Sequence, residues 1–169
     1  MEAFKFIPSA LILLFVWVQW VEPHWLRFRK VTVRLKKPLA RPLRILHLSD
    51  LHTTKHHFHL DSFFDRLVKL ELDLDLVLVT GDLIDAESGI APCVANLKKI
   101  QSRLGTYVVL GNHDYRNYHS LRVWRHLFTK KDSYTFRAES QRNRLKEQLS
   151  KAGAKVLFNE SLRIALGHG

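Results

Sequence analysis

Cysteine and acidic side chains are both scarce in this 169-residue sequence. Cys93 is the single cysteine, so the chain cannot form an intramolecular disulfide, and one thiol says little about the redox compartment. Acidic residues number 16 against 27 lysines and arginines, and the formal net charge of +11 creates a field that attracts polyanions. Nucleic acid, anionic lipid head groups and phosphorylated substrates are all partners of that kind. A disordered chain is excluded, because 46% hydrophobic and 25% charged residues are typical of a globular domain.

Long apolar stretches are rare too, and the one present lies at the amino terminus, at Phe6–Val21, without a charged residue. A helix of that length is roughly 24 Å long, somewhat short of a ~30 Å hydrocarbon core. Trp17, Trp20 and Trp25 suit an interfacial aromatic belt. The sequence lacks a small-x-small cleavage site after the run and twin arginines before it, which disfavours a signal peptide. We therefore expect residues 1–25 to form an uncleaved membrane anchor, either spanning the bilayer or lying in one leaflet; the alternative is a hydrophobic core helix.

A basic segment follows the apolar run, whereas only Lys5 and the acid Glu2 precede it. Its cations are Arg27, Arg29, Lys30, Arg34, Lys36, Lys37, Arg41 and Arg44. Because positive residues stay on the cytoplasmic side of an anchor, we expect a protein anchored in the inner (cytoplasmic) membrane with its main domain in the cytoplasm. The segment would also hold that domain against an anionic membrane surface, at roughly 1 kcal/mol per residue. We interpret residues 26–42, punctuated by Pro38 and Pro42, as a basic linker.

From residue 43 onwards, short apolar runs alternate with segments in which apolar residues recur at a spacing near 3.6. The predicted elements are strands within 43–50, 74–82 and 105–114, helices at Leu60–Leu72 and Ile90–Leu104 between them, then a helix at Ser140–Ala152 and strands at Val156–Phe158 and Leu162–Leu166. Strands that alternate with helices are the signature of βαβ units and a parallel sheet. We therefore expect one α/β domain over residues 43–169.

Polar side chains follow each of the first three predicted strands, at the point where the strand ends. The blocks are Asp50-x-His52, Gly81-Asp82-x-x-Asp85 and Gly111-Asn112-His113-Asp114. The carboxyl ends of parallel strands lie along one edge of a sheet, where open α/β folds bind ligands. Single acids there often only cap a helix, but carboxylates, imidazoles and an amide together favour a site. Oxygen and nitrogen donors without thiolate suit Mn, Fe, Zn or Mg.

The blocks "DLH", "GDLID" and "GNHD", in this order and each after a predicted strand, resemble the calcineurin-like metallophosphoesterase superfamily. The resemblance implies a hydrolase with two divalent metal ions. Asp50, His52 and Asp82 would bind one ion, and Asp82 would bridge to a second ion that Asn112 also holds. A carboxylate has two oxygens, so Asp82 can coordinate one ion with each oxygen and bridge the two.

The same resemblance implies roles for two residues beside the metals. His113 would bind the phosphate and assist the leaving group, while Asp85 would orient His113 and stabilise its charge. The superfamily completes its metal site with a "GHxH"-like motif beyond the third block, and His168 in "RIALGHG" lacks the second histidine. We therefore expect the amino-terminal half of an αββα sandwich, with the remaining ligands downstream or on another polypeptide, and little turnover by this chain alone.

Residues 115–144 are rich in arginine, lysine and aromatic side chains, and they are expected beside the crevice. They would either cover it and admit a lipid with a phosphorylated head group, or form an ordinary amphipathic helix. With the anchor, they resemble membrane-associated members of the superfamily such as the UDP-2,3-diacylglucosamine pyrophosphatase type of lipid A synthesis. We expect a phosphorylated, lipid-linked substrate. A nuclease-like phosphodiesterase is an alternative that the tether disfavours, since it limits access to nucleic acid, and a non-catalytic remnant is another.

Overall fold

The structure is a computed structural model that describes residues 14–17, 28–37, 39, 41–55, 58–118 and 134–166. The chain divides into two compact units, residues 1–40 and 41–169. Within the first unit residues 14–17 are helical, and the rest of the predicted anchor lies outside the described residues. Among the described residues, no helix combines the length and the hydropathy that crossing a bilayer requires.

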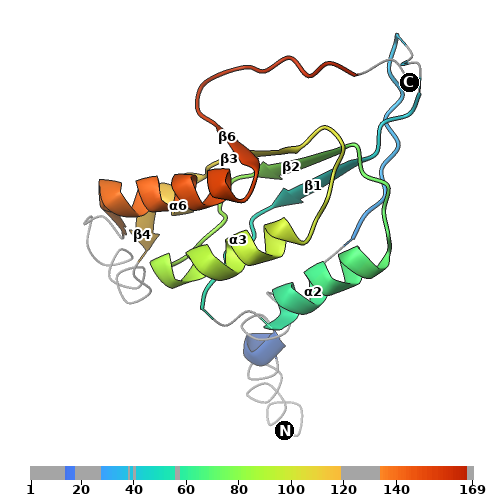
Figure 1. Cartoon of the computed structure of the whole chain (residues 1–169). Helices are drawn as coiled ribbons and strands as arrows, with labels where there is room; N and C mark the ends of the chain where they lie inside the picture. Colours follow the sequence, from blue (N-terminus) through green and yellow to red (C-terminus); the bar gives the residue numbers. More distant parts are fainter. Residues whose placement is uncertain are drawn as a thin grey trace, which may run out of the picture. The chain divides into compact units, whose positions relative to one another are not determined.

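A parallel four-stranded sheet forms the centre of the second unit (Figure 1). Its strands, in spatial order, are β1 (Ile45–Ser49), β2 (Leu76–Thr80), β3 (Thr106–Val109) and β6 (Ala154–Leu157). The helices between them are α2 (Phe58–Lys69), α3 (Ile90–Lys98) and α6 (Glu139–Lys151), with the short 3-10 helix η4 (Glu87–Gly89) directly before α3. The α/β class and the parallel sheet that the sequence predicts are confirmed.

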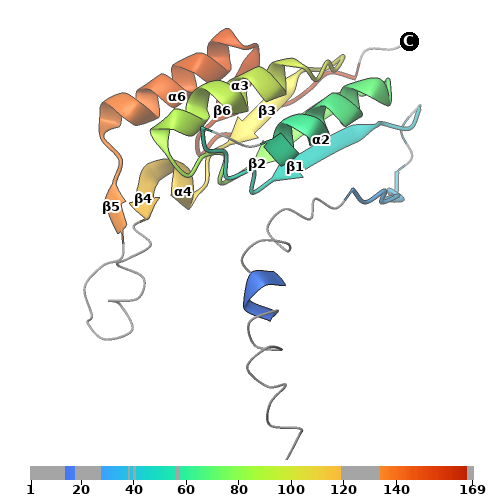
Figure 2. The ribbon, with the colours of Figure 1, turned by 90° about the horizontal axis from the view of Figure 1, so that it is seen from below.

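The three helices cover one face of the sheet (Figures 1 and 2). Alternate strand residues point to that face because the side-chain period of a strand is two. Leu46 and Leu48 of β1, and Val77 and Val79 of β2, are buried there against helix side chains such as Phe64. Residues of opposite parity face the other way: Ile45 is 48% exposed and Val109 47%. The core of the described domain therefore lies between the sheet and its helices.

The first residues of the second unit bind a buried carboxylate. Asp75, which is only 1% exposed, accepts a hydrogen bond from Arg41 at 2.7 Å and another from the main-chain N–H of Arg44 at 2.8 Å. A second guanidinium, that of Arg103, also binds its carboxylate. A buried carboxylate needs partners of this kind to offset its lost hydration. The start of the domain near residue 41 is thus set by an ion-pair network.

Two predicted elements depart most from the structure. The strand predicted at Leu162–Leu166 is irregular chain instead. Asn159, two residues after β6, has a left-handed φ of 49°, which interrupts extended backbone, and an alternating pattern without a neighbouring strand forms no ladder. The helix predicted to reach Leu104 ends at Lys98, where the next two N–H groups bond three residues back in a tightened last turn.

The segment after β3 forms α4 (Asn112–Tyr115) and β4 (Arg116–Tyr118), which pairs antiparallel with β5 (Tyr134–Phe136). Figure 2 shows α4 and β4 at the end of the sheet to which the strand arrows point. Residues 119–133, the centre of the basic, aromatic segment, lie outside the described residues. The two alternatives for that segment therefore stay predictions.

Candidate metal centre

The chain leaves β1 and β2 in two loops that run side by side. The N–H of Asp50 donates to the carbonyl of Gly81 at 3.2 Å, and that of His52 donates to the carbonyl of Asp82 at 2.9 Å. Asp50, His52 and Asp82 have φ angles of 55°, 45° and 53°. Non-glycine residues rarely adopt this left-handed region, which costs roughly 1–3 kcal/mol each and concentrates at functional sites. The predicted ligands are thus held in strained backbone.

A glycine lets the third block approach the second. A Cβ on Gly111 would lie 2.1 Å from Oδ1 of Asp82 and 2.4 Å from the Asp82 main-chain nitrogen. Only a residue without a side chain fits at that distance. Oδ1 of Asp82 also accepts the N–H of His113 at 3.0 Å. The loop after β2 and the first turn of α4 are therefore in direct contact.

Acidic and histidine side chains from the three blocks converge at this edge. Asp50, His52 and Asp82 form one group whose potential ligand atoms lie within 4.8 Å of one another. His52, Asp85 and His113 form a second such group, so His52 belongs to both. Side chains at this spacing can share metal ions. The convergence expected from the strand order is present.

Asn112 differs from the other predicted ligands. It is the first residue of α4, next to His113, and its side chain is exposed. An amide oxygen at this place offers one neutral donor. Its role as a ligand of the second ion stays a prediction.

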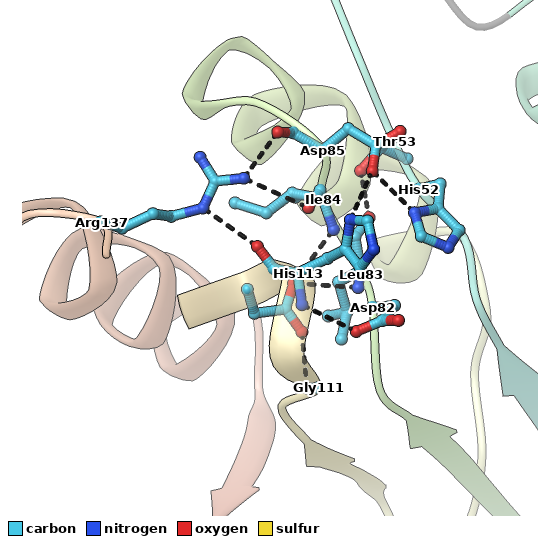
Figure 3. A network of polar contacts seen from close by, with 10 residues as sticks. His52, Thr53, Asp82, Leu83, Ile84, Asp85, Gly111, His113 and Arg137 are labelled. Atoms are coloured by element: carbon cyan, nitrogen blue, oxygen red, sulfur yellow. Dashed lines mark hydrogen bonds and ion pairs between the residues drawn. The ribbon is translucent and has the colours of Figure 1, made fainter. Parts of the chain in front are cut away.

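Asp85 connects two imidazoles. Its Oδ1 lies 2.7 Å from Nδ1 of His52 and 3.2 Å from Nδ1 of His113, and the two rings meet edge to face with centroids 4.6 Å apart. Figure 3 shows these three side chains together. The contact with His113 agrees with the predicted pairing, whereas the shorter contact with His52 was not predicted. A carboxylate on Nδ1 is the usual way to orient a histidine whose Nε2 binds a metal.

The contact between Asp85 and His52 shifts the pKa values of both residues. The hydrogen bond that His52 donates to the Asp85 carboxylate raises the pKa of His52; burial opposes the shift, and the charges of Asp85, Asp82 and Asp50 add to it. Burial alone would raise the pKa of Asp85, but the hydrogen bond and charge of His52, together with His113, lower it. Asp85 is therefore ionised and ready to hold a cationic or metal-bound imidazole.

Two residues that sequence analysis assigned no role also shape the centre. Asp114 is fully buried; its Oδ1 accepts the N–H groups of Leu83 at 2.9 Å and Ile84 at 3.0 Å, and its Oδ2 that of Gly111 at 2.8 Å. Burial raises the pKa of Asp114, and these hydrogen bonds partly offset the rise. Arg137, which follows β5, donates to the carbonyl of Asp85 in the loop after β2 and to the carbonyl of His113 after β3 (Figure 3). The position of Asp114 inside "GNHD" was the only available signal for it.

The remaining histidines do not enlarge the centre among the residues that the structure describes. Nε2 of His47 lies 2.6 Å from Oγ1 of Thr80, and His59 is exposed on α2. The other six, His24, His56, His57, His119, His126 and His168, lie outside the described residues. The expectation that the remaining ligands lie downstream or on another polypeptide therefore stays a prediction.

Comparisons with known proteins agree with the motifs. A family model described as "Calcineurin-like phosphoesterase" matches residues 43–168. The chain is 33% identical over 120 residues to the "UDP-2,3-diacylglucosamine pyrophosphatase LpxG" of Chlamydia trachomatis, which covers 66% of the chain and 35% of the relative. It is 39% identical over 89 residues to the "Transmembrane protein with metallophosphoesterase domain" of Bos taurus, covering 51% of the chain and 20% of the relative. For the metallophosphoesterase YkoQ of Bacillus subtilis the identity is 30% over 135 residues, covering 78% and 42%. The chain thus spans less than half the length of these relatives.

Proposed function

The chain belongs to the calcineurin-like phosphoesterase family, and we propose that it is a metal-dependent hydrolase of phosphate esters or anhydrides. The observation that carries the proposal is the convergence of Asp50, His52, Asp82, Asp85 and His113 at the carboxyl edge of the sheet. The carboxylates at this edge would repel a negatively charged ligand on their own. Divalent cations bound between the carboxylates and imidazoles would remove that repulsion, and a phosphate could then bind through the cations.

The side chains present fit two divalent ions. Asp50, His52 and Asp82 would hold the first ion, and Asp82 and Asn112 would contribute to the second. The ligand set is oxygen and imidazole nitrogen, because the single thiol, Cys93, is buried in the core with its pKa raised to about 12 by burial. Such a set suits Mn, Fe, Zn or Mg. When bound, the two ions activate water as a nucleophile and neutralise charge on the phosphoryl group.

His113 is the residue that we assign to the substrate. Its imidazole is 27% exposed, so a phosphate can reach it, and Asp85 contacts its Nδ1 at 3.2 Å. That contact orients the ring so that Nε2 is the atom we expect to meet a phosphoryl oxygen. A proton on His113, stabilised by the Asp85 carboxylate, would pass to the leaving oxygen as the phosphorus–oxygen bond breaks. Asp85 therefore acts through His113 and His52 rather than on the substrate.

The substrate that we favour is a lipid-linked nucleotide-sugar anhydride of lipid A synthesis. The first support is the likeness to a relative named as a UDP-2,3-diacylglucosamine pyrophosphatase. The second is the basic segment beside an apolar run, which would keep the enzyme at an anionic bilayer where such a substrate resides. We accordingly propose residues 1–25 as an anchor, 26–42 as a basic linker and 43–169 as the metallophosphoesterase domain.

The proposal is tested by hydrolysis assays with added Mn²⁺ on three substrates: UDP-2,3-diacylglucosamine, UDP-glucose and an aryl phosphodiester. In a chain extended by the downstream ligands, we expect metal-dependent release of UMP from the acylated substrate. Asp82→Asn should abolish it, whereas Asp73→Asn, which changes an exposed acid outside the ligand groups, should leave it unaffected. Preference for the aryl diester or for DNA would support the nuclease alternative. Equal rates for wild type and Asp82→Asn would contradict the assigned site.

A further inference from the structure

Arg137 is a buried cation that binds main-chain oxygens rather than acidic side chains. Its side chain is only 3% exposed. Nε donates to the carbonyl of His113 at 3.1 Å, and one terminal nitrogen donates to the carbonyls of Asp85 at 2.6 Å and Ile84 at 3.4 Å. Figure 3 shows the guanidinium between the loop after β2, which carries Asp85, and the loop after β3, which carries His113. One planar side chain thus connects the loop after β2 with the loop after β3.

Burying this charge is costly, so packing alone does not account for it. Removing a guanidinium from water costs several kcal/mol unless hydrogen bonds and opposite charges compensate. Burial lowers the pKa of Arg137, while the nearby charges of Asp114, Asp85 and Glu87 oppose that shift. An apolar side chain would fill the same space without the cost. The feature that only arginine supplies is a rigid fork of donors, able to hold two backbone segments at a set separation.

Arg137 and Asp114 act on opposite sides of the same peptide segment. The N–H of Ile84 donates to the Asp114 carboxylate at 3.0 Å, and the carbonyl of Ile84 accepts from Arg137 at 3.4 Å. The segment that carries Asp85 is therefore held at its N–H groups by a buried anion and at its carbonyls by a buried cation. Asp114 also binds the N–H of Gly111, and Arg137 the carbonyl of His113. Both charged groups join the same two loops.

We propose that Arg137 is a positioning residue that sets the placement of His113 relative to Asp85. The inference rests on the proposed function, because His113 is the residue assigned to the phosphate and Asp85 is the residue that orients it. Arg137 directly follows β5, and its own N–H donates to the carbonyl of Tyr115 at 2.8 Å. The β4–β5 pair is therefore joined to the site through Arg137. A displacement of this pair would move the guanidinium and with it the two loops.

The test compares Arg137→Lys, Arg137→Met and Arg137→Ala with the matched control Arg144→Met. Arg144 belongs to α6, is 63% exposed and pairs with Glu87, outside the ligand groups. We expect kcat to fall about 10- to 100-fold in the three Arg137 variants, since misplacement near 1 Å has that effect, with KM changed by less than about threefold. Added guanidinium at a non-denaturing concentration should restore part of kcat in Arg137→Ala but not in the others. Arg144→Met should stay within about twofold of wild type.

A second measurement does not depend on hydrolysis. In metal-free protein we expect the imidazole NMR resonances of His113 to shift in Arg137→Lys, which retains the charge and is the variant most certain to fold, and to stay in place in Arg144→Met. Unchanged His113 resonances in all folded Arg137 variants would overturn the positioning role, whatever the activity. If the His113 resonances shift in the Arg137 variants but the wild-type protein hydrolyses no phosphate compound, the proposed function would instead be overturned and the positioning role would remain.

Discussion

Oδ1 of Asp82 accepts a hydrogen bond from the main-chain N–H of His113 at 3.0 Å. The residue predicted to bridge two metal ions therefore also holds the loop that carries the predicted phosphate ligand. A carboxylate can accept several hydrogen bonds and still coordinate a cation through its remaining lone pairs. Changing Asp82 consequently acts on the metal site directly and on the placement of His113 indirectly.

The first prediction separates these two effects with Asp82→Asn. The amide oxygen can still accept the N–H of His113, so we expect the free energy of unfolding of the metal-free protein to change by less than about 1.5 kcal/mol. The lost negative charge should abolish binding of the second ion and nearly all turnover. Metal content by mass spectrometry after dialysis, with Asp73→Asn as the control, is the measurement. Undiminished occupancy in Asp82→Asn would show that another residue bridges the ions.

The second prediction concerns Gly111→Ala. Its φ of −100° suits any residue, so the effect is purely steric: the new Cβ would meet Asp82 at 2.1 Å. We expect the protein to lose about 1–3 kcal/mol of stability, as over-packed sites do, and to bind Mn²⁺ more weakly. Gly153→Ala is the control. It has open space around it but a φ of 85°, so backbone strain should cost about 1–3 kcal/mol and leave metal binding unchanged. Equal metal affinities in the two variants would be incompatible with this close approach.

The third prediction concerns the two membrane signals. Deletion of residues 1–21 should weaken attachment to vesicles but leave residual binding through the basic linker, which is screened as the Debye length shrinks to ~3 Å at 1 M salt. Flotation with vesicles containing an anionic lipid, at low and high salt, measures both contributions. Neutral vesicles serve as the control. Salt-independent flotation of the shortened protein would show that a further apolar surface attaches it.

Sequence analysis predicted ligands among the residues that follow strands and missed the residues that hold those loops in place. Asp50 and Asp82 could be predicted because each lies within two residues of the end of a recognisable apolar run, and parallel strands end at one edge. Asp114 accepts hydrogen bonds from main-chain N–H groups about 30 residues earlier in the chain. Nearly every residue type can supply a main-chain N–H, so the identity of these partners leaves no pattern in the sequence. Arg137 could not be told apart from the other arginines of its segment, because its burial depends on a tertiary contact 52 residues away.

The same limit explains the wrong strand at Leu162–Leu166. Alternating apolar residues describe what a strand would bury, whereas a strand forms only where a neighbour supplies hydrogen bonds. β6 has that neighbour in β3, over Thr106–Val109, and the ladder ends at Leu157. Local sequence therefore predicted the strands inside the sheet better than the chain that leaves it.

The last prediction uses the pair formed by His52 and Asp85 in metal-free protein. The folded-state pKa of His52 is raised, so its contribution to stability is fully present below about pH 6.5, its usual unfolded value, and is lost as pH rises through the folded pKa. The folded-state pKa of Asp85 is lowered, so its contribution is present above about pH 3.9 and is lost as pH falls through the lower folded value. The pair should stabilise the protein most between these limits. Since the side chains are 35% and 41% exposed, solvent screening keeps the gain below about 1 kcal/mol.

Bound metal should reverse the sign of this pH dependence, because a cation and a proton compete for His52. In EDTA, urea unfolding should show a larger stability difference between wild type and Asp85→Asn at pH 5.5 than at pH 8. With Mn²⁺ present, wild-type stability should instead gain from the higher pH as the imidazole is freed for the ion. A His52→Gln variant, which cannot titrate, should lose both dependences. If wild type and His52→Gln respond alike to pH with and without Mn²⁺, then His52 is not a metal ligand, and the first of the two metal sites would have to be assigned to other residues.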